Sequence, residues 1–168
     1  VEVTVFDDGK GQATKAAAGI ISPWFSKRRN KAWYRMARLG ADFYQDLIAE
    51  LKDAGIQTDF YQQTGVYLLK KDESKLQELY DLAANRREES PLIGDLSLLS
   101  LQEAHEKFPD LQGFERLLYA SGGARVEGAL LTKTLLKASK AELVEKKVSL
   151  IVEGEELQIG RASCRERV

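Results

Sequence analysis

The residues best suited to ligand chemistry are two adjacent carboxylates, Asp7 and Asp8, which follow a β-branched run at residues 1–6. A carboxylate at the end of a buried strand can accept hydrogen bonds from the two ribose hydroxyls of a dinucleotide. The sequence Asp-Asp-Gly also forms turns readily. The sequence contains no GxGxxG motif, which would have favoured a dinucleotide site. A ribose-binding role and a plain turn therefore both remain possible interpretations of Asp7 and Asp8.

A run of small residues at positions 13–21 (ATKAAAGII) is the second candidate. It could be a close-packed helix turn. Alternatively, Thr14 supplies a hydroxyl donor, and Gly19 removes a Cβ immediately before Ile20 and Ile21. Small residues would let main-chain N–H groups approach a phosphate or a flat ring.

The elements that would position these residues alternate between strands and helices. The pattern predicts strands over 1–6, 65–69 and 117–120, helices over 30–54, from 72 and over 127–139, a short helix opened by a capping box at Ser100, and a hairpin over 143–159 turning near 153–155. This order predicts an α/β domain with an inserted α+β section. We expect Val3 and Val5 to be buried in a parallel sheet, with Asp7 facing a crevice at its carboxyl edge.

Composition excludes several kinds of chemistry. Twenty-five Lys and Arg balance 26 Asp and Glu, which gives no overall basic surface for nucleic acid. The sequence has no apolar run of about 20 residues that could span a membrane. Cys164 and His105 are the single cysteine and the single histidine, so an internal disulfide and a Cys/His zinc cluster are excluded. We expect His105 to be solvated or locally hydrogen-bonded, and Arg86 and Arg87 to be solvated at a helix end.

The stretch VTVFDDGKGQATKAAAGIISP resembles the second strand and flavin-contacting loop of the FAD-dependent D-amino acid oxidase family, most closely its glycine oxidase-like branch. The similarity continues through the long helix, GIQTDFYQQTGVYLL and LVEKKVSLIVEGEELQI, and covers roughly residues 1–160. The resemblance implies a Rossmann-like FAD-binding domain, with FAD as cofactor and an amino acid or amine as the small-molecule substrate.

Residue roles follow from the same resemblance. Asp7 would hold the adenosine ribose with Asp8 beside it, and Ala13 and Thr14 would line the pyrophosphate and ribityl path. The remaining cofactor contacts would be Ala18, Gly19 and Ile20 along the isoalloxazine ring, and a main-chain group of Val148, just inside a later strand, at the adenine edge. The family's substrate-binding Arg and Tyr would follow Gly160, so the resemblance assigns no catalytic side chain and no metal ligand to this chain.

The resemblance also implies a domain plan. We expect an FAD-binding domain in residues 1–58 and 121–160, a substrate-domain portion in 59–120, and a cloning-junction tail in 161–168. We expect the chain to be an internal fragment, inactive alone, of a cytoplasmic oxidoreductase that could be a homo-oligomer. A nicotinamide-dependent oxidoreductase and a non-catalytic α/β interaction domain remain the alternatives.

Overall fold

Two units make up the chain in the computed structural model, which describes residues 2–153 and 156–160. The first unit contains Val1–Ala17 and Gly128–Val168, and the second contains Ala18–Glu127. These bounds differ from the boundaries expected at 58/59 and 120/121. The division into units does not assign a cofactor or a substrate to either unit, so the expected domain roles remain predictions.

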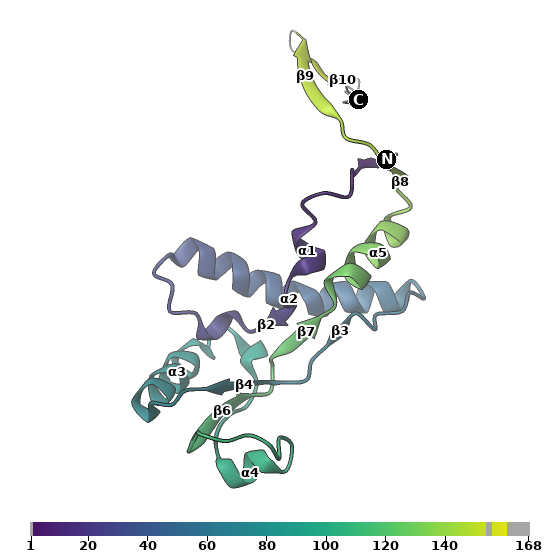
Figure 1. Ribbon diagram of the computed structural model, residues 1–168. Helices are drawn as coiled ribbons and strands as arrows, with labels where there is room; N and C mark the ends of the chain where they lie inside the picture. The colour runs from purple at the N-terminus through teal and green to yellow at the C-terminus, as the bar shows by residue number, and fades with distance from the viewer. Residues whose placement is uncertain (1, 154–155, 161–168) are drawn as a thin grey trace, which may run out of the picture. The chain divides into compact units, whose positions relative to one another are not determined.

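The first unit is built around a short parallel strand pair (Figure 1). Strand β1 (Thr4–Phe6) pairs in parallel with β8 (Glu142–Val144), and Val5 lies opposite Leu143. Helix α1 (Ala13–Ala16) packs against the start of α5 (Gly128–Ser139). The contact requires a glycine at position 128, because a Cβ there would overlap the carbonyl oxygen of Thr14.

Parallel pairing of the first strand is confirmed, but its expected burial is wrong. Val3 is 52% exposed and Val5 is half-buried. Among the described residues β8 is the one strand that pairs with β1, and a two-stranded pair has little surface with which to cover a side chain. Alternation of β-branched residues predicted the strand but could not show what covers its faces.

The predicted hairpin is shorter than expected. Strand β9 (Ser149–Glu153) pairs antiparallel with β10 (Glu156–Gly160), whereas Leu143 belongs to β8. The expected turn at 153–155 extends into residues 154–155, which lie outside the described residues. The expected tail at 161–168 lies outside them too.

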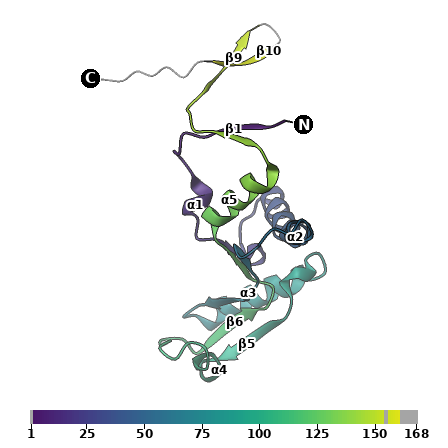
Figure 2. The ribbon, with the colours of Figure 1, turned by 90° about the vertical axis from the view of Figure 1, so that its right-hand side faces the viewer.

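The second unit contains two antiparallel sheets. One has the order β2 (Ile20–Ile21), β7 (Ala124–Val126), β3 (Tyr61–Gln62). The other has the order β4 (Val66–Leu69), β6 (Arg116–Ala120), β5 (Leu96–Ser100). Helix α3 (Glu73–Arg86) packs on β6 and β5 (Figure 2), and α4 (Leu101–His105) follows β5. Helices packed beside an antiparallel sheet confirm the expected α+β section.

The hydrophobic core of this unit lies between α3, the sheet and the segments that precede and follow α3 in the chain. The 3-10 turn η1 (Pro23–Phe25) precedes the long helix α2 (Lys31–Asp53), and a second turn, η2 (Pro91–Ile93), follows α3. The buried cluster contains Trp24, Phe25, Ala41, Leu76, Leu79, Ala83, Ile93, Leu118 and Ala120. Burying such side chains contributes about 1.5–3 kcal/mol for each large one. This cluster therefore fixes η1 and α2 against the sheet.

Arg86 is not a solvated helix end as expected. Its guanidinium donates to the carbonyl oxygens of Trp24 and Ser26 and lies 3.9 Å from the centre of the Tyr34 ring. The last turn of α3 thereby anchors η1. The adjacent Arg87 is exposed, as expected.

Candidate functional site

Asp7 occupies the first position after β1, at the carboxyl end of the parallel pair. Its main-chain N–H donates to the carbonyl oxygen of Val144 at 3.1 Å, which continues the pairing with β8. Its Oδ1 accepts from the N–H of Gly9 at 2.8 Å, and its Oδ2 accepts from Nε2 of Gln12 at 2.8 Å. Each carboxylate oxygen therefore has one fixed donor and retains capacity for a second.

These donors also set the charge state of the carboxylate. The hydrogen bond from Gly9, then that from Gln12, and more weakly the positive charge of Lys15, hold the pKa of Asp7 below its ordinary value. Asp7 is thus anionic at neutral pH, and both of its oxygens act only as acceptors, which suits hydrogen bonds from a diol.

Asp8 has a more local role. Its Oδ1 accepts from the main-chain N–H of Lys10 at 3.1 Å, and its side chain is exposed. Both aspartates therefore shape the turn, which confirms the turn interpretation of the sequence. A turn role leaves Asp7 free to bind a ligand as well, because its remaining acceptor sites are not used by the turn.

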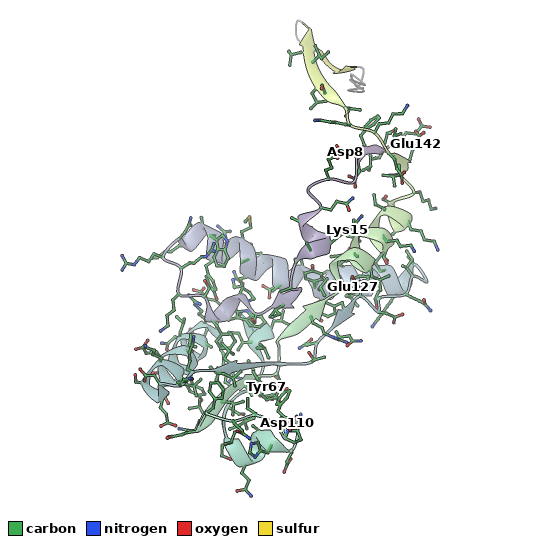
Figure 3. The ribbon with its side chains drawn as sticks, viewed as in Figure 1. Asp8, Lys15, Tyr67, Asp110, Glu127 and Glu142 are labelled. Carbon is green, nitrogen blue, oxygen red and sulfur yellow. The ribbon has the colours of Figure 1, made fainter. Side chains whose placement is uncertain are left out.

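An open hollow of about 380 Å³ lies beside these residues. Three of its side chains are carboxylates and one is an ammonium, and Figure 3 shows Asp8 beyond β1 and Lys15 on α1. The full lining is Asp7, Asp8, Gly9, Gln12, Lys15, Leu136, Leu143 and Glu145. Such a surface suits hydroxyl donors better than phosphate, whose charge the carboxylates would repel.

The small-residue run divides between the two units. Ala13 and Thr14 lie in α1 of the first unit, and both are exposed. The predicted helix turn is confirmed, because residues 13–16 form a four-residue helix. The side chains of Ala13 and Thr14 are not closely packed as that interpretation expected, since both are exposed. These two residues accordingly leave their surface free for another molecule.

Ala18, Gly19 and Ile20 belong to the second unit. Gly19 has φ of +70°, and a Cβ there would overlap the carbonyl oxygen of Val126. Its own carbonyl accepts from the N–H of Val126 at 2.7 Å. The glycine is therefore required by the approach of β7, whether or not a ring lies beside it. Ala18 and Ile20 are exposed, Ile20 to 68%.

Val148 lies one residue before β9 rather than just inside it, and it is half-buried. The strand begins at Ser149, where the antiparallel register with β10 begins. The structure thus brings Asp7 and Asp8 together at the hollow. Ala13, Thr14 and Val148 lie elsewhere in the same unit.

Other chemical groups do not form a site. Nε2 of His105 lies 2.8 Å from the carbonyl oxygen of Leu111, which confirms a local hydrogen bond. Over residues 2–153 and 156–160 no group of three or more His, Cys, Asp or Glu side chains could hold a metal ion. In the same ranges, no helix combines the length and apolar character needed to cross a bilayer.

Two polar side chains with structural roles were not predicted from the sequence. Gln12 orients the Asp7 carboxylate, and nothing in its sequence spacing signals that contact. Arg125 lies on β7 and donates to Gln62 on β3. The alternation Ala124-Arg125-Val126 could have identified Arg125 as an outward-facing polar residue in a short strand.

Comparison with known proteins defines the class of this chain. The profile of a family described as FAD dependent oxidoreductase matches residues 1–166. The chain is 41% identical over 155 residues to the uncharacterized oxidoreductase YurR of Bacillus subtilis, covering 90% of this chain and 42% of that protein. It is 31% identical over 141 residues to a glycine oxidase of Pseudomonas putida, covering 82% and 36%. The chain belongs to this family of FAD-dependent oxidoreductases.

Solved structures agree with this assignment. The iminodiacetate oxidase of Chelativorans sp. BNC1 superposes with a TM-score of 0.87 at 30% identity, covering 95% of this chain and 44% of that protein. A glycine oxidase of Geobacillus kaustophilus has the same fold, with a TM-score of 0.72 at 22% identity over 94% of this chain and 44% of its own. The expected Rossmann-like α/β class is confirmed by these matches. The chain spans less than half the length of the relatives it matches.

Proposed function

We propose that this chain forms part of a flavoenzyme that oxidises an amine or amino acid, with Asp7 accepting hydrogen bonds from the adenosine ribose of FAD. Bound FAD would supply the oxidant for such a reaction by accepting a hydride from the carbon beside the amine, and water would hydrolyse the imine product. The cofactor carries the redox chemistry, while the protein orients it and the substrate.

The position and state of Asp7 carry the cofactor assignment. The carboxylate is at the carboxyl end of a parallel strand, is anionic, and has one unused acceptor position on each oxygen. Ligands of open α/β sheets bind beyond such strand ends. The exposed Ala13 and Thr14 add support, because small exposed residues leave space for the rest of the dinucleotide.

The domain plan and substrate class belong to the same proposal. We assign residues 1–58 and 121–160 to FAD binding and 59–120 to the substrate domain, and Ala18, Gly19, Ile20 and Val148 to further cofactor contacts. Relatives named as glycine oxidases and an iminodiacetate oxidase support a small amine that carries a carboxylate. A nicotinamide-dependent enzyme is disfavoured, because the matching family is FAD-dependent.

Anaerobic reduction of the bound flavin tests this function. The full-length protein should be yellow, and its flavin absorbance should bleach on addition of glycine or iminodiacetate. Ethylamine, which lacks the carboxylate, serves as the control and should bleach it far more slowly. A protein that binds no flavin, or whose flavin is reduced by NADH but by no carboxylated amine, would contradict the proposal.

A further inference from the structure

Three side chains form a row across one face of the β2–β7–β3 sheet. Arg125 on the central strand is the register partner of Ile20 on β2 and of Gln62 on β3. Register partners place their side chains on the same face. All three residues are exposed, so this face carries an apolar, a cationic and an amide group side by side.

The opposite face of this sheet is occupied. Ala124 is buried, Tyr61 is half-buried, and the Tyr61 ring stacks on Tyr44 of α2 with centroids 5.3 Å apart. Nε2 of Gln45 also donates to the Tyr61 hydroxyl at 2.8 Å. Side chains of α2 therefore pack against Tyr61 on this face. The three side chains of the row are exposed in the part of the chain that the structure describes.

The Arg125 guanidinium is held in one orientation and is not neutralised. Its Nε and Nη2 both donate to Oε1 of Gln62, at 2.9 and 2.5 Å. Gln62 is a neutral partner, and no carboxylate in the described part of the chain forms an ion pair with Arg125. Within residues 2–153 and 156–160 the Nη1 group donates to no partner. Its two N–H donors can therefore bind an anion through charge-assisted hydrogen bonds.

We propose that Arg125 binds a carboxylate of the substrate and selects amines that carry two carboxylates, with Gln62 as its positioning residue. This inference rests on the proposed function, and it goes beyond it by naming a specificity residue. Charge complementarity supports this ligand, because the Arg125 guanidinium is held in place by a neutral partner and can form a bidentate pair with a carboxylate. Ile20, beside it in the row, is also the residue proposed to lie along the flavin ring.

A second carboxylate is what distinguishes the two candidate substrates. Glycine has one carboxylate, whereas iminodiacetate has two on the same amine. Arg125 binds the second carboxylate of iminodiacetate. Replacing Arg125 should therefore weaken iminodiacetate binding more than glycine binding. The structural similarity to an iminodiacetate oxidase, with a TM-score of 0.87, agrees with this choice of ligand.

Calorimetric titration of the full-length protein, with its FAD reduced beforehand by dithionite and oxygen excluded, tests the inference without turnover, because reduced flavin cannot accept a hydride from the added amine. Arg125→Gln should raise the dissociation constant of iminodiacetate about tenfold or more, as expected for loss of a charged hydrogen bond. The constant for glycine should change less than about twofold. Arg125→Lys should recover part of the affinity, because the charge remains but the planar fork is lost. Gln62→Ala should give an intermediate loss.

Arg116→Gln is the matched control, since Arg116 is an exposed arginine on β6 of the other sheet. It should leave both constants unchanged. Equal constants for wild type and Arg125→Gln, equal losses for both ligands, or a wild-type protein that binds no iminodiacetate would each overturn the inference. Loss of FAD from Arg125→Gln without a change in iminodiacetate affinity would overturn it too. If Arg125→Gln behaves as expected while no amine bleaches the flavin, the carboxylate site stands and the proposed function fails.

Discussion

At the scale of single residues, the geometry of Asp7 is compatible with both roles that its sequence position left open, a turn and the proposed ribose contact. Its carboxylate fixes the turn by accepting from Gly9, and it still presents acceptor sites toward the hollow. Gln12 completes the arrangement from five residues further along. A turn and a ribose site are therefore compatible in one side chain.

Removing Gln12 should change the charge state of Asp7. Gln12→Ala deletes a donor that stabilises the carboxylate, so the pKa of Asp7 should rise toward its ordinary value. A pH titration of the Asp7 carboxyl carbon by NMR measures this. Gln77→Ala removes an equivalent Gln–Asp pair on α3, in which Gln77 donates to Asp81 at 2.9 Å, and should leave the pKa of Asp7 unchanged. An Asp7 titration that is the same in Gln12→Ala and wild type would show that Gln12 does not hold the carboxylate.

Two glycines should respond to alanine in opposite directions. Gly19→Ala should destabilise the protein by about 1–3 kcal/mol even without flavin, because its positive φ is strained for alanine and the new Cβ meets the Val126 carbonyl. Gly40 lies inside α2, and a Cβ there meets nothing, so Gly40→Ala should stabilise by about 0.4–1 kcal/mol. Urea unfolding of both variants measures these changes. If Gly19→Ala were as stable as wild type without FAD, the close approach of β7 would not be what requires the glycine.

At the scale of elements, acid should weaken the start of α3. Asp72 caps this helix, and its pKa is lowered chiefly by the hydrogen bond from the Ser74 hydroxyl. A carboxyl with a lowered folded-state pKa stabilises the protein above its unfolded pKa, and that stability is lost as pH falls through the folded value.

Asp72→Asn keeps a capping side chain but removes the titration. The unfolding free energy of wild type should therefore decline more steeply below about pH 4 than that of the variant. Denaturant unfolding at pH 7 and at pH 3 provides the comparison. Parallel declines would mean that the Asp72 cap does not contribute to acid sensitivity.

Helices and strands with a clear apolar period or a capping motif could be predicted from the sequence. The long helix α2, the capping box at Ser100 and the strand β6 were predicted within a few residues. The two-residue strands β2 and β3 were not, because such short segments are set by tertiary pairing with β7 and carry no period of their own. β5 (LSLLS) was also missed, since a short apolar run does not by itself distinguish a strand from a helix.

In the candidate site, only a residue whose type and local sequence position indicate its chemistry could be predicted from the sequence. Asp7 stood out because a carboxylate follows a strand. Arg125 and Gln62 are 63 positions apart and meet through the register of β3 and β7, which no local pattern reveals. Exposure of Val3 was likewise unpredictable, because alternation does not show whether another layer covers the strand.

At the scale of the whole molecule, family membership and local geometry support each other. A family of FAD-dependent oxidoreductases matches nearly the entire chain, and the carboxylate at the end of β1 has the properties that a ribose requires. Neither observation alone identifies the substrate. Together these observations make Asp7 the residue on which the proposed cofactor site depends.

The FAD dissociation constant of full-length Asp7 variants tests this claim most directly. Titration of apoprotein with FAD, followed by flavin fluorescence, should show that Asp7→Ala and Asp7→Asn bind about tenfold or more weakly than wild type. Asp81→Ala removes another carboxylate that accepts a hydrogen bond from a glutamine side chain, and this variant should bind FAD like wild type. An unchanged constant in both Asp7 variants would contradict the account and leave Asp7 as a residue of the turn alone.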